Sequence, residues 1–134
     1  MGEIFSVKTL ETTQSLDITA QVEAIVSRSG VASGFCHVMV LHSTAAVVVN
    51  ENDDPNIGVD VVEALGRVVP TRGKWLHDRI DDNAHSHIKA SILGASELIA
   101  IQDGELLLGR WQGIILFEFD GPRERRVSVQ FLGG

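Results

Sequence analysis

The stretch WQGIILFEFDGPRERRVSVQFL, residues 111–132, indicates the fold class of this chain. Two alternating apolar segments flank the turn residues DGP at 120–122, a pattern typical of two antiparallel strands joined by a tight turn. The segment before it, ELIAIQDGELLLGRW at 97–111, repeats this design around DG at 103–104, because Asp and Gly tolerate the positive φ of a hairpin turn. The second half of the chain is therefore predicted to be mostly antiparallel sheet.

The first half mixes strands with amphipathic helices. Val22, Ile25 and Val26 fall on one helical face that ends at Gly30, while a second helix is predicted from Val59, Val62, Leu65 and Val69. We expect strands at 2–10, 15–19, 35–42 and 45–50, and helices at 19–30, 53–69 and 85–94. The strands at 35–42 and 45–50 show little polar alternation, which predicts cover on both faces. The whole predicts one compact α+β domain over residues 1–134, with a large, mostly antiparallel sheet and three helices.

Composition limits the classes of function. Eighteen acidic against eleven basic residues give a net charge of −7, which disfavours a broad surface for nucleic acid or an anionic membrane. No apolar run approaches the ~20 residues that span a bilayer, and the single cysteine, Cys36, is expected as a buried thiol. We therefore expect a cytoplasmic protein without nucleic-acid or membrane partners. Arg123, Arg125 and Arg126 cluster near the C-terminus, a pattern more typical of a solvated face than of a phosphate site.

The first stretch with chemical potential is LHSTAAVVVNENDDP, residues 41–55. His42 ends an apolar strand and is followed by two hydroxyl side chains. If 35–42 and 45–50 pair as a hairpin, His42 lies near the turn and the acids at 51–54 lie near the far end, so the two groups need not meet within one subunit. A Ser43–His42 nucleophile pair is disfavoured, because adjacent strand residues point to opposite faces. Asp53 and Asp54 have an alternative role as capping acids for the next helix.

The second stretch is WLHDRIDDNAHSHIK, residues 75–89, with three histidines and three aspartates. In a strand His85 and His87 would share a face, whereas in a helix they would lie about 200° apart. Asn83 before a run that ends at Gly94 favours a helix capped by Asn83, with His87 facing in and His77 reaching the same place. Such ligands suit zinc or manganese, or magnesium if carboxylates dominate. The alternative is a charged helix start with exposed histidines.

The third stretch is GRWQGIILFEF, residues 109–119. Gly113 allows close approach of a backbone or a ligand beside Trp111 and Gln112. Glu118 shares a face with Leu116 and Ile114 by alternation. It is expected either on a solvated face or as a buried acid paired with a cation or a histidine.

Together these stretches resemble the YjbQ-like family, the secondary thiamine-phosphate synthase enzymes. The resemblance rests on HSTA at 42–45, NENDDP at 50–55, WLHD at 75–78, DDNAHSHIKASILG at 81–94, GRWQGI at 109–114 and FEFDGPRERRV at 117–127, in matching order over nearly the whole chain. It implies an α+β fold, a homotrimer with pockets at subunit boundaries, and the coupling of a pyrimidine diphosphate to a thiazole phosphate. The family has threonine in a GTWQ motif where Arg110 stands here, so the resemblance assigns Arg110 no role.

Roles can then be distributed over the candidate residues. A divalent metal and nearby cations would neutralise the departing pyrophosphate of a phosphorylated small-molecule substrate. The expected roles are proton transfer or orientation by His42; metal or water positioning by Glu51, Asp54 and Asp82; metal ligation by His77, His87 and His85; phosphate binding by Lys89 and Arg110; and substrate contacts by Ser43, Thr44, Asn50 and Gln112. Two alternatives stay open: a metal-dependent hydrolase of a small phosphorylated or amide substrate, and a non-enzymatic trimer that binds a metal or small molecule.

Overall fold

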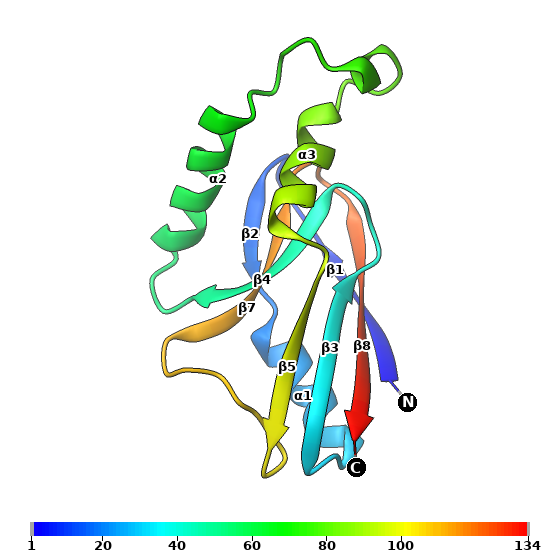
Figure 1. Ribbon diagram of the computed structural model, residues 1–134, viewed down its shortest axis with the longest axis vertical. Helices are drawn as coiled ribbons and strands as arrows, with labels where there is room; N and C mark the ends of the chain where they lie inside the picture. Colours follow the sequence, from blue (N-terminus) through cyan, green and yellow to red (C-terminus); the bar gives the residue numbers. More distant parts are fainter. Residues whose placement is uncertain (1, 134) are drawn as a thin grey trace.

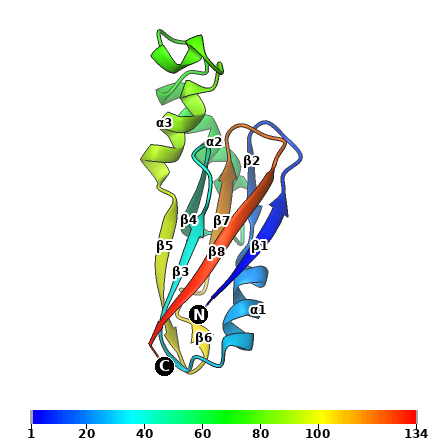
Figure 2. The ribbon, with the colours of Figure 1, turned by 90° about the vertical axis from the view of Figure 1, so that its right-hand side faces the viewer.

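The computed structural model of the chain describes residues 2–133 and consists of two antiparallel sheets packed face to face (Figures 1 and 2). The strands are β1 (Gly2–Lys8), β2 (Gln14–Asp17), β3 (Ser33–Val40), β4 (Ala45–Glu51), β5 (Ser96–Gln102), β6 (Glu105–Leu106), β7 (Gln112–Glu118) and β8 (Glu124–Gly133). The helices are α1 (Thr19–Ser29), α2 (Asn56–Val68) and α3 (Ala84–Leu93), with a 3-10 turn η1 (Leu76–Arg79). One sheet has the order β1-β8-β3-β5-β6 and the other β2-β7-β4. The predicted α+β class with mostly antiparallel strands and three helices is confirmed.

The predicted hairpin around the DGP turn is wrong. β7 pairs with β2 and β4, whereas β8 pairs with β1 and β3, so the DGP turn at 120–122 joins the two sheets. β3 and β4 are divided in the same way. The physical reason lies in β7, which is apolar on both faces; a plain hairpin would leave one of those faces bare. The hairpin at 103–104 is confirmed, since Gln102 pairs with Glu105 and both turn residues have positive φ, 53° and 79°.

Two apolar layers hold the sheets and helices together. The inner core lies between the sheets and is closed by Val22, Ile25 and Val26 of α1, as predicted. The outer core lies between the other face of β4 and β7 and the helices α2 and α3, where Phe117 and Phe119 stack with ring centroids 6.3 Å apart. Cover on both sides explains why β7 is buried along almost its whole length.

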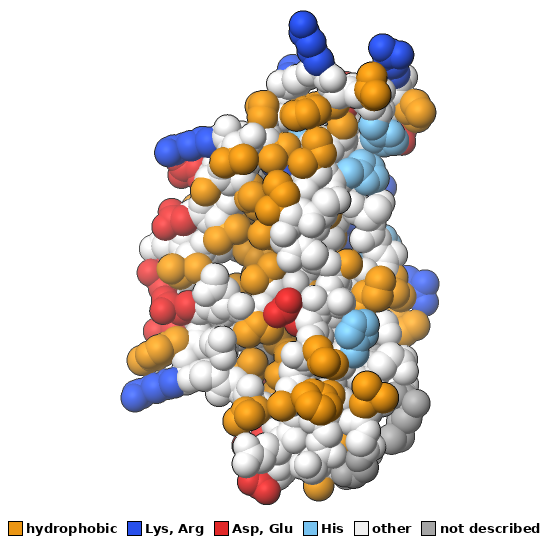
Figure 3. Space-filling model, in the orientation of Figure 1, with side chains coloured by type: hydrophobic (Ala, Val, Ile, Leu, Met, Phe, Trp, Pro, Cys, Tyr) orange, Lys and Arg blue, Asp and Glu red, His pale blue; other side chains and the backbone are white. Residues whose placement is uncertain are grey.

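Two predictions about which surfaces the helices cover differ from the structure. Val59 was expected on the buried face of α2 but is 58% exposed; Val61 packs against the outer core together with Val62 and Leu65. β3 was expected to be covered on both faces, yet no helix lies on the outer face of the five-stranded sheet in the described chain (Figure 2). Hydrophobic side chains are exposed on this face (Figure 3), and Phe35 and Met39 are among the exposed ones. Among residues 2–133, no helix is long and apolar enough to cross a membrane.

A buried ion pair joins the two sheets at one end of the molecule. Glu118 at the end of β7 is 0% exposed and Arg125 in β8 is 2% exposed. Arg125 Nε donates to Glu118 Oε1 over 2.8 Å, and Arg125 Nη2 donates to Glu118 Oε2 and to the Thr44 hydroxyl. The Thr9 hydroxyl donates to Glu118 Oε1 over 2.7 Å. Glu118 is thus the paired buried acid of the two expected alternatives.

These four residues stand where the chain crosses between sheets. Thr9 follows β1, Thr44 precedes β4, and the ion pair flanks the crossing from β7 to β8. Burial raises the pKa of Glu118, but hydrogen bonds from Arg125, the Asp120 N–H and Thr9 outweigh it, so the pKa lies below its usual value. The buried pair therefore bonds to the chain at three passages between the sheets: after β1, before β4 and between β7 and β8.

Removing one partner should destabilise the fold strongly. We expect Arg125→Met to lower the free energy of unfolding by about 3–5 kcal/mol, because it leaves the Glu118 carboxylate buried without a cation. Denaturant unfolding followed by circular dichroism measures this difference.

The matched control is Arg67→Met. In the wild-type protein the Arg67 guanidinium pairs with Glu63 on the exposed surface of α2. Its effect should be far smaller, because exposed ion pairs contribute little. Equal losses for the two variants would contradict a structural role for the buried pair.

Candidate functional site

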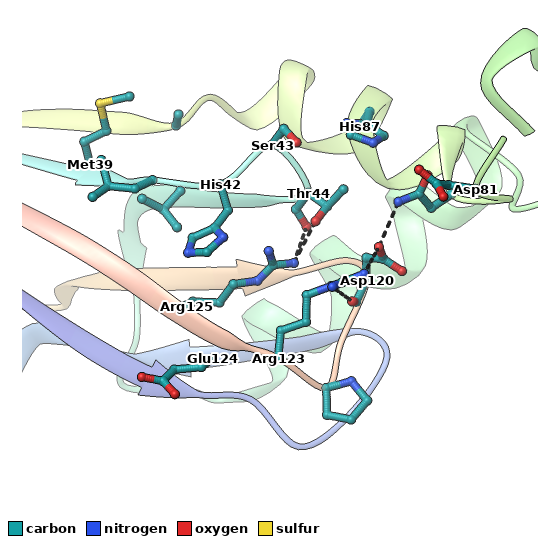
Figure 4. A pocket seen from close by; sticks show the side chains of 15 residues that line it. Met39, His42, Ser43, Thr44, Asp81, His87, Asp120, Arg123, Glu124 and Arg125 are labelled. Atoms are coloured by element: carbon teal, nitrogen blue, oxygen red, sulfur yellow. Dashed lines mark hydrogen bonds and ion pairs between the residues drawn. The ribbon is translucent and has the colours of Figure 1, made fainter.

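A cleft of about 1110 Å³ opens beside this buried pair (Figure 4). Its walls come from three segments far apart in the sequence: the crossing from β3 to β4, the crossing from β7 to β8, and the chain that leads into α3. Its lining includes His42, Ser43, Thr44, Asp81, Asn83, His87, Asp120, Arg123, Glu124 and Arg125. The HSTA, DDNAHSH and FDGPRER stretches of the sequence thus meet at one place.

His42 is held as a neutral hydrogen-bond donor. Its Nε2 accepts a hydrogen bond from the Arg126 backbone N–H over 2.9 Å, so in the neutral ring the proton is on Nδ1. Burial lowers the pKa of His42, and the charges of Arg125, Arg126 and Arg123 lower it further against the opposing effect of Glu118. The ring therefore offers an N–H group to a ligand near neutral pH.

A second network fixes the start of α3 to the β7–β8 crossing. Asp120 Oδ2 accepts hydrogen bonds from Asn83 Nδ2 over 2.8 Å and from Arg123 Nη2 over 2.9 Å. Burial raises the pKa of Asp120, but these two donors outweigh it and the net pKa is lowered. Asn83 stands at the N-cap position of α3 as predicted, but its side chain makes no capping hydrogen bond; Asp78 Oδ1 accepts from the Ala84 N–H over 3.0 Å instead.

The histidines of 75–89 divide into two groups, as a helix requires. The rings of His77 and His87 lie edge to face with centroids 4.8 Å apart, and His87 lines the cleft. His85 is buried on another face, where its Nδ1 lies 3.0 Å from Lys89 Nζ. Burial, followed by the Lys89 charge, lowers the pKa of His85 against the opposing Asp120 and Asp78.

Lys89 lies inside the protein. It is 4% exposed, its Nζ lies 6.0 Å from the centroid of the Phe119 ring, and burial lowers its pKa. It is not part of the cleft lining. The structure therefore does not bring this expected phosphate ligand to the cleft.

The histidine pair meets part of the requirements for a metal site. His77 Nε2 is buried without a hydrogen-bond partner and lies 3.7 Å from Asp81 Oδ2. Imidazole nitrogen and carboxylate oxygen are suitable ligands for zinc or manganese. Within residues 2–133, however, no three His, Cys, Asp or Glu side chains are grouped as metal ligands. His77, with the His87 ring and the Asp81 carboxylate each beside it, thus falls short of a three-ligand site, and His85 lies on another face.

The remaining expected residues lie away from the cleft. Asn50, Glu51 and Gln112 are at the other end of the β4–β7 pair, roughly 20 Å along the strand from Thr44 at about 3.3 Å per residue. Arg110 stacks on the Trp111 ring beside them, with its guanidinium carbon 4.8 Å from the centroid.

Two expected acids serve the backbone or stand in turns. Asp54 Oδ1 accepts a hydrogen bond from the Asn56 N–H at the first residue of α2, which agrees with the capping alternative. Asp82 is exposed with a φ of 59° in the turn before α3, and it does not line the cleft.

Sequence reasoning missed Asp120, Arg123 and Arg125 as cleft residues. The arginines were assigned to a solvated face, whereas Arg125 is buried. The signal was Glu118: an acid on the apolar face of a strand requires a cation, and the arginine cluster stands only a few residues away.

The His42 geometry predicts a pH effect on stability. Because the folded pKa lies below the unfolded value, near 6.5, the unfolded state binds more protons as pH falls, and stability is lost from that value down to the folded pKa. An NMR titration of the ring should give a pKa below 6.5. His42→Gln, which can retain an acceptor for the Arg126 N–H, should lose less stability over this pH interval. A pKa above 6.5 would contradict the assignment of Nε2 as a fixed acceptor.

Comparison with known proteins places the chain in a family. The family model described as UPF0047 protein YjbQ-like matches residues 3–134. The chain is 35% identical to the UPF0047 protein YugU of Bacillus subtilis, covering 99% of this chain and 100% of the relative. It is 41% identical to a UPF0047 protein of Archaeoglobus fulgidus, covering 95% and 98%.

Solved structures show the same fold. A YjbQ-like protein of unknown function from Sulfolobus solfataricus superposes with a TM-score of 0.96 at 40% identity, covering 100% of this chain and 97% of the other. A hypothetical protein from Aeropyrum pernix gives a TM-score of 0.96 at 42% identity, covering 100% and 99%. The motifs, the two-sheet fold and these matches agree, and the chain belongs to the YjbQ-like UPF0047 family.

Proposed function

We propose that the cleft binds a phosphorylated small molecule and that the protein has thiamine-phosphate synthase activity, coupling a pyrimidine diphosphate to a thiazole phosphate. The observation that carries the proposal is the convergence of HSTA, DDNAHSH and FDGPRER on one polar cleft. Its volume of about 1110 Å³ lies just above the about 300–1,000 Å³ that is common for small-molecule sites, so it is large enough for compounds of this size. The resemblance to the synthase family supplies the reaction.

The reaction requires stabilisation of a leaving anion rather than a protein nucleophile. The thiazole nitrogen forms a bond to the methylene carbon of the pyrimidine, the carbon–oxygen bond breaks, and pyrophosphate departs with the electron pair. Groups that neutralise charge on the departing oxygens lower this barrier. The His42 N–H and the exposed Ser43 hydroxyl are available in the cleft for that purpose.

A divalent metal fits this proposal in part. His77 and His87, with Asp81 beside them, would hold the ion, and the remaining positions would be filled by substrate oxygens or a second subunit. When bound, such an ion neutralises phosphate charge or activates water. The second of these roles would support a hydrolase, which the unpartnered His77 Nε2 beside a carboxylate favours as the second candidate.

A homotrimer with shared sites is part of the proposal. Some expected residues, such as His42 and His87, line the cleft, whereas others, such as Glu51 and Gln112, lie at the opposite end of β4 and β7, so a shared site would use both groups. Met39 and Leu41 line the cleft and continue onto the partly exposed outer face of the five-stranded sheet. Apolar surface next to a cleft supports a subunit boundary there.

A cytoplasmic location also stays a prediction.

Product analysis tests the reaction. With both substrates and a divalent metal, the protein should release pyrophosphate and form thiamine phosphate in equal amounts, and neither substrate alone should react. Phosphate release from one substrate would favour the hydrolase. Binding without any turnover would leave a non-enzymatic trimer that binds a metal or small molecule. The oligomeric mass, measured in the same sample, should be that of three chains.

Metal content tests the ligand assignment. The double variant His77→Ala, His87→Ala should lose bound metal and activity while its oligomeric mass and circular dichroism stay unchanged, because neither ring belongs to the two apolar cores. The matched control is His37→Ala on the outer sheet face, which should retain full metal occupancy. Full occupancy in the double variant would contradict the assignment.

A further inference from the structure

A guanidinium edge of Arg125 is open to the floor of the cleft. Nε and Nη2 of this side chain are bound to Glu118 and Thr44, whereas Nη1 makes no hydrogen bond to any described residue. Among residues 2–133, only His77 Nε2 and Asn83 Oδ1 are buried side-chain polar atoms without a partner. Arg125 Nη1 is therefore not sealed in the core; it faces the cleft that Arg125 lines, between His42 and Thr44 in Figure 4.

We infer that this corner of the cleft is the subsite for the phosphate or diphosphate group of the ligand, bound by Arg125 Nη1 with His42 and Arg123 beside it. The assignment rests on the proposed function for the class of ligand. It replaces Lys89, which is buried, and it uses no contact from Arg110, which in the same chain lies at the other end of the sheet.

Arg125 is already positioned for this role. Its side chain is 98% buried, and the bonds to Glu118 and Thr44 fix the plane of the guanidinium. A planar, always charged group that has lost its rotamer freedom during folding binds phosphate oxygens without further ordering cost. A lysine at this position could not bind Glu118 through two donors and still present a further N–H group to the cleft.

His42 and Arg123 extend the set of donors. The Arg126 N–H occupies His42 Nε2, so the Nδ1–H is the free group of the ring. Arg123 is 52% exposed and uses Nε and Nη2 on Asp120, which leaves Nη1 for a ligand. Three donors from three side chains thus border one corner of the cleft.

The charge distribution confines an anion to this corner. Glu118 and Asp120 are each paired with an arginine, whereas Asp81 and Glu124 line the cleft as exposed acids. Around His42, the charges of Arg125, Arg126 and Arg123 outnumber the single negative charge of Glu118. A dianion is therefore attracted to the Arg125 edge and repelled by Asp81 and Glu124.

Titration with inorganic pyrophosphate tests the subsite. In the wild-type protein, binding should raise the pKa of the His42 ring and shift the side-chain NMR signals of Arg125. His42→Gln and Arg123→Gln should each weaken binding about tenfold, the usual effect of losing one hydrogen bond to a charged group. Arg28→Gln removes one positive charge from the far surface of α1 and should leave the affinity unchanged.

The outcomes separate this inference from the proposed function. Pyrophosphate binding with unchanged His42 signals, or with equal affinity in Arg123→Gln and wild type, overturns the subsite even if coupling activity is found. Absence of pyrophosphate binding overturns it as well. Binding that depends on His42 and Arg123 supports the subsite even if the coupling assay fails, in which case only the reaction is rejected.

Discussion

The Glu118–Arg125 pair is the constraint on which this structure depends. Three of the passages between the two sheets, next to Thr9, next to Thr44 and between Glu118 and Arg125, bond to the same buried charges. Charges removed from water are costly unless fully paired and hydrogen-bonded. The buried pair therefore holds the crossings together, alongside backbone hydrogen bonds such as those from the Phe119 N–H to the Thr44 carbonyl and from the Gly121 N–H to the Thr12 carbonyl.

The same requirement creates the cleft. A crossing from one sheet to the other cannot continue the regular ladder of hydrogen bonds, so polar side chains collect there to satisfy the backbone. The His42 ring accepts a hydrogen bond from the Arg126 backbone N–H. The Asp120 carboxylate accepts hydrogen bonds from the side chains of Asn83 and Arg123. After these bonds are made, Arg125 Nη1 and the His42 Nδ1–H group have no hydrogen-bond partner among residues 2–133 at this corner. The side chains that hold them are already ordered by folding. Preorganised donors of this kind are suited to an anionic ligand.

The sequence predicted the local elements well because short-range physics determines them. Apolar spacing placed α1 with its buried face, the DG turn identified the β5–β6 hairpin, and the separation of His85 from His87 followed from helical geometry. The pairing of strands was less accessible. The DGP turn has the residues of a hairpin turn, yet β7 and β8 lie in different sheets. The reason is that both faces of β7 are apolar and need cover. The cleft depends on that partition, so Asp120, Arg123 and Arg125 could not be placed by spacing alone.

A crystal structure of the protein with bound pyrophosphate would locate the anion relative to both ends of the β4–β7 pair. We expect pyrophosphate oxygens within hydrogen-bond distance of Arg125 Nη1 and His42 Nδ1, with the Glu118–Arg125 pair unchanged. Pyrophosphate bound instead beside Arg110 and Gln112, with the Arg125 corner empty, would contradict this expectation.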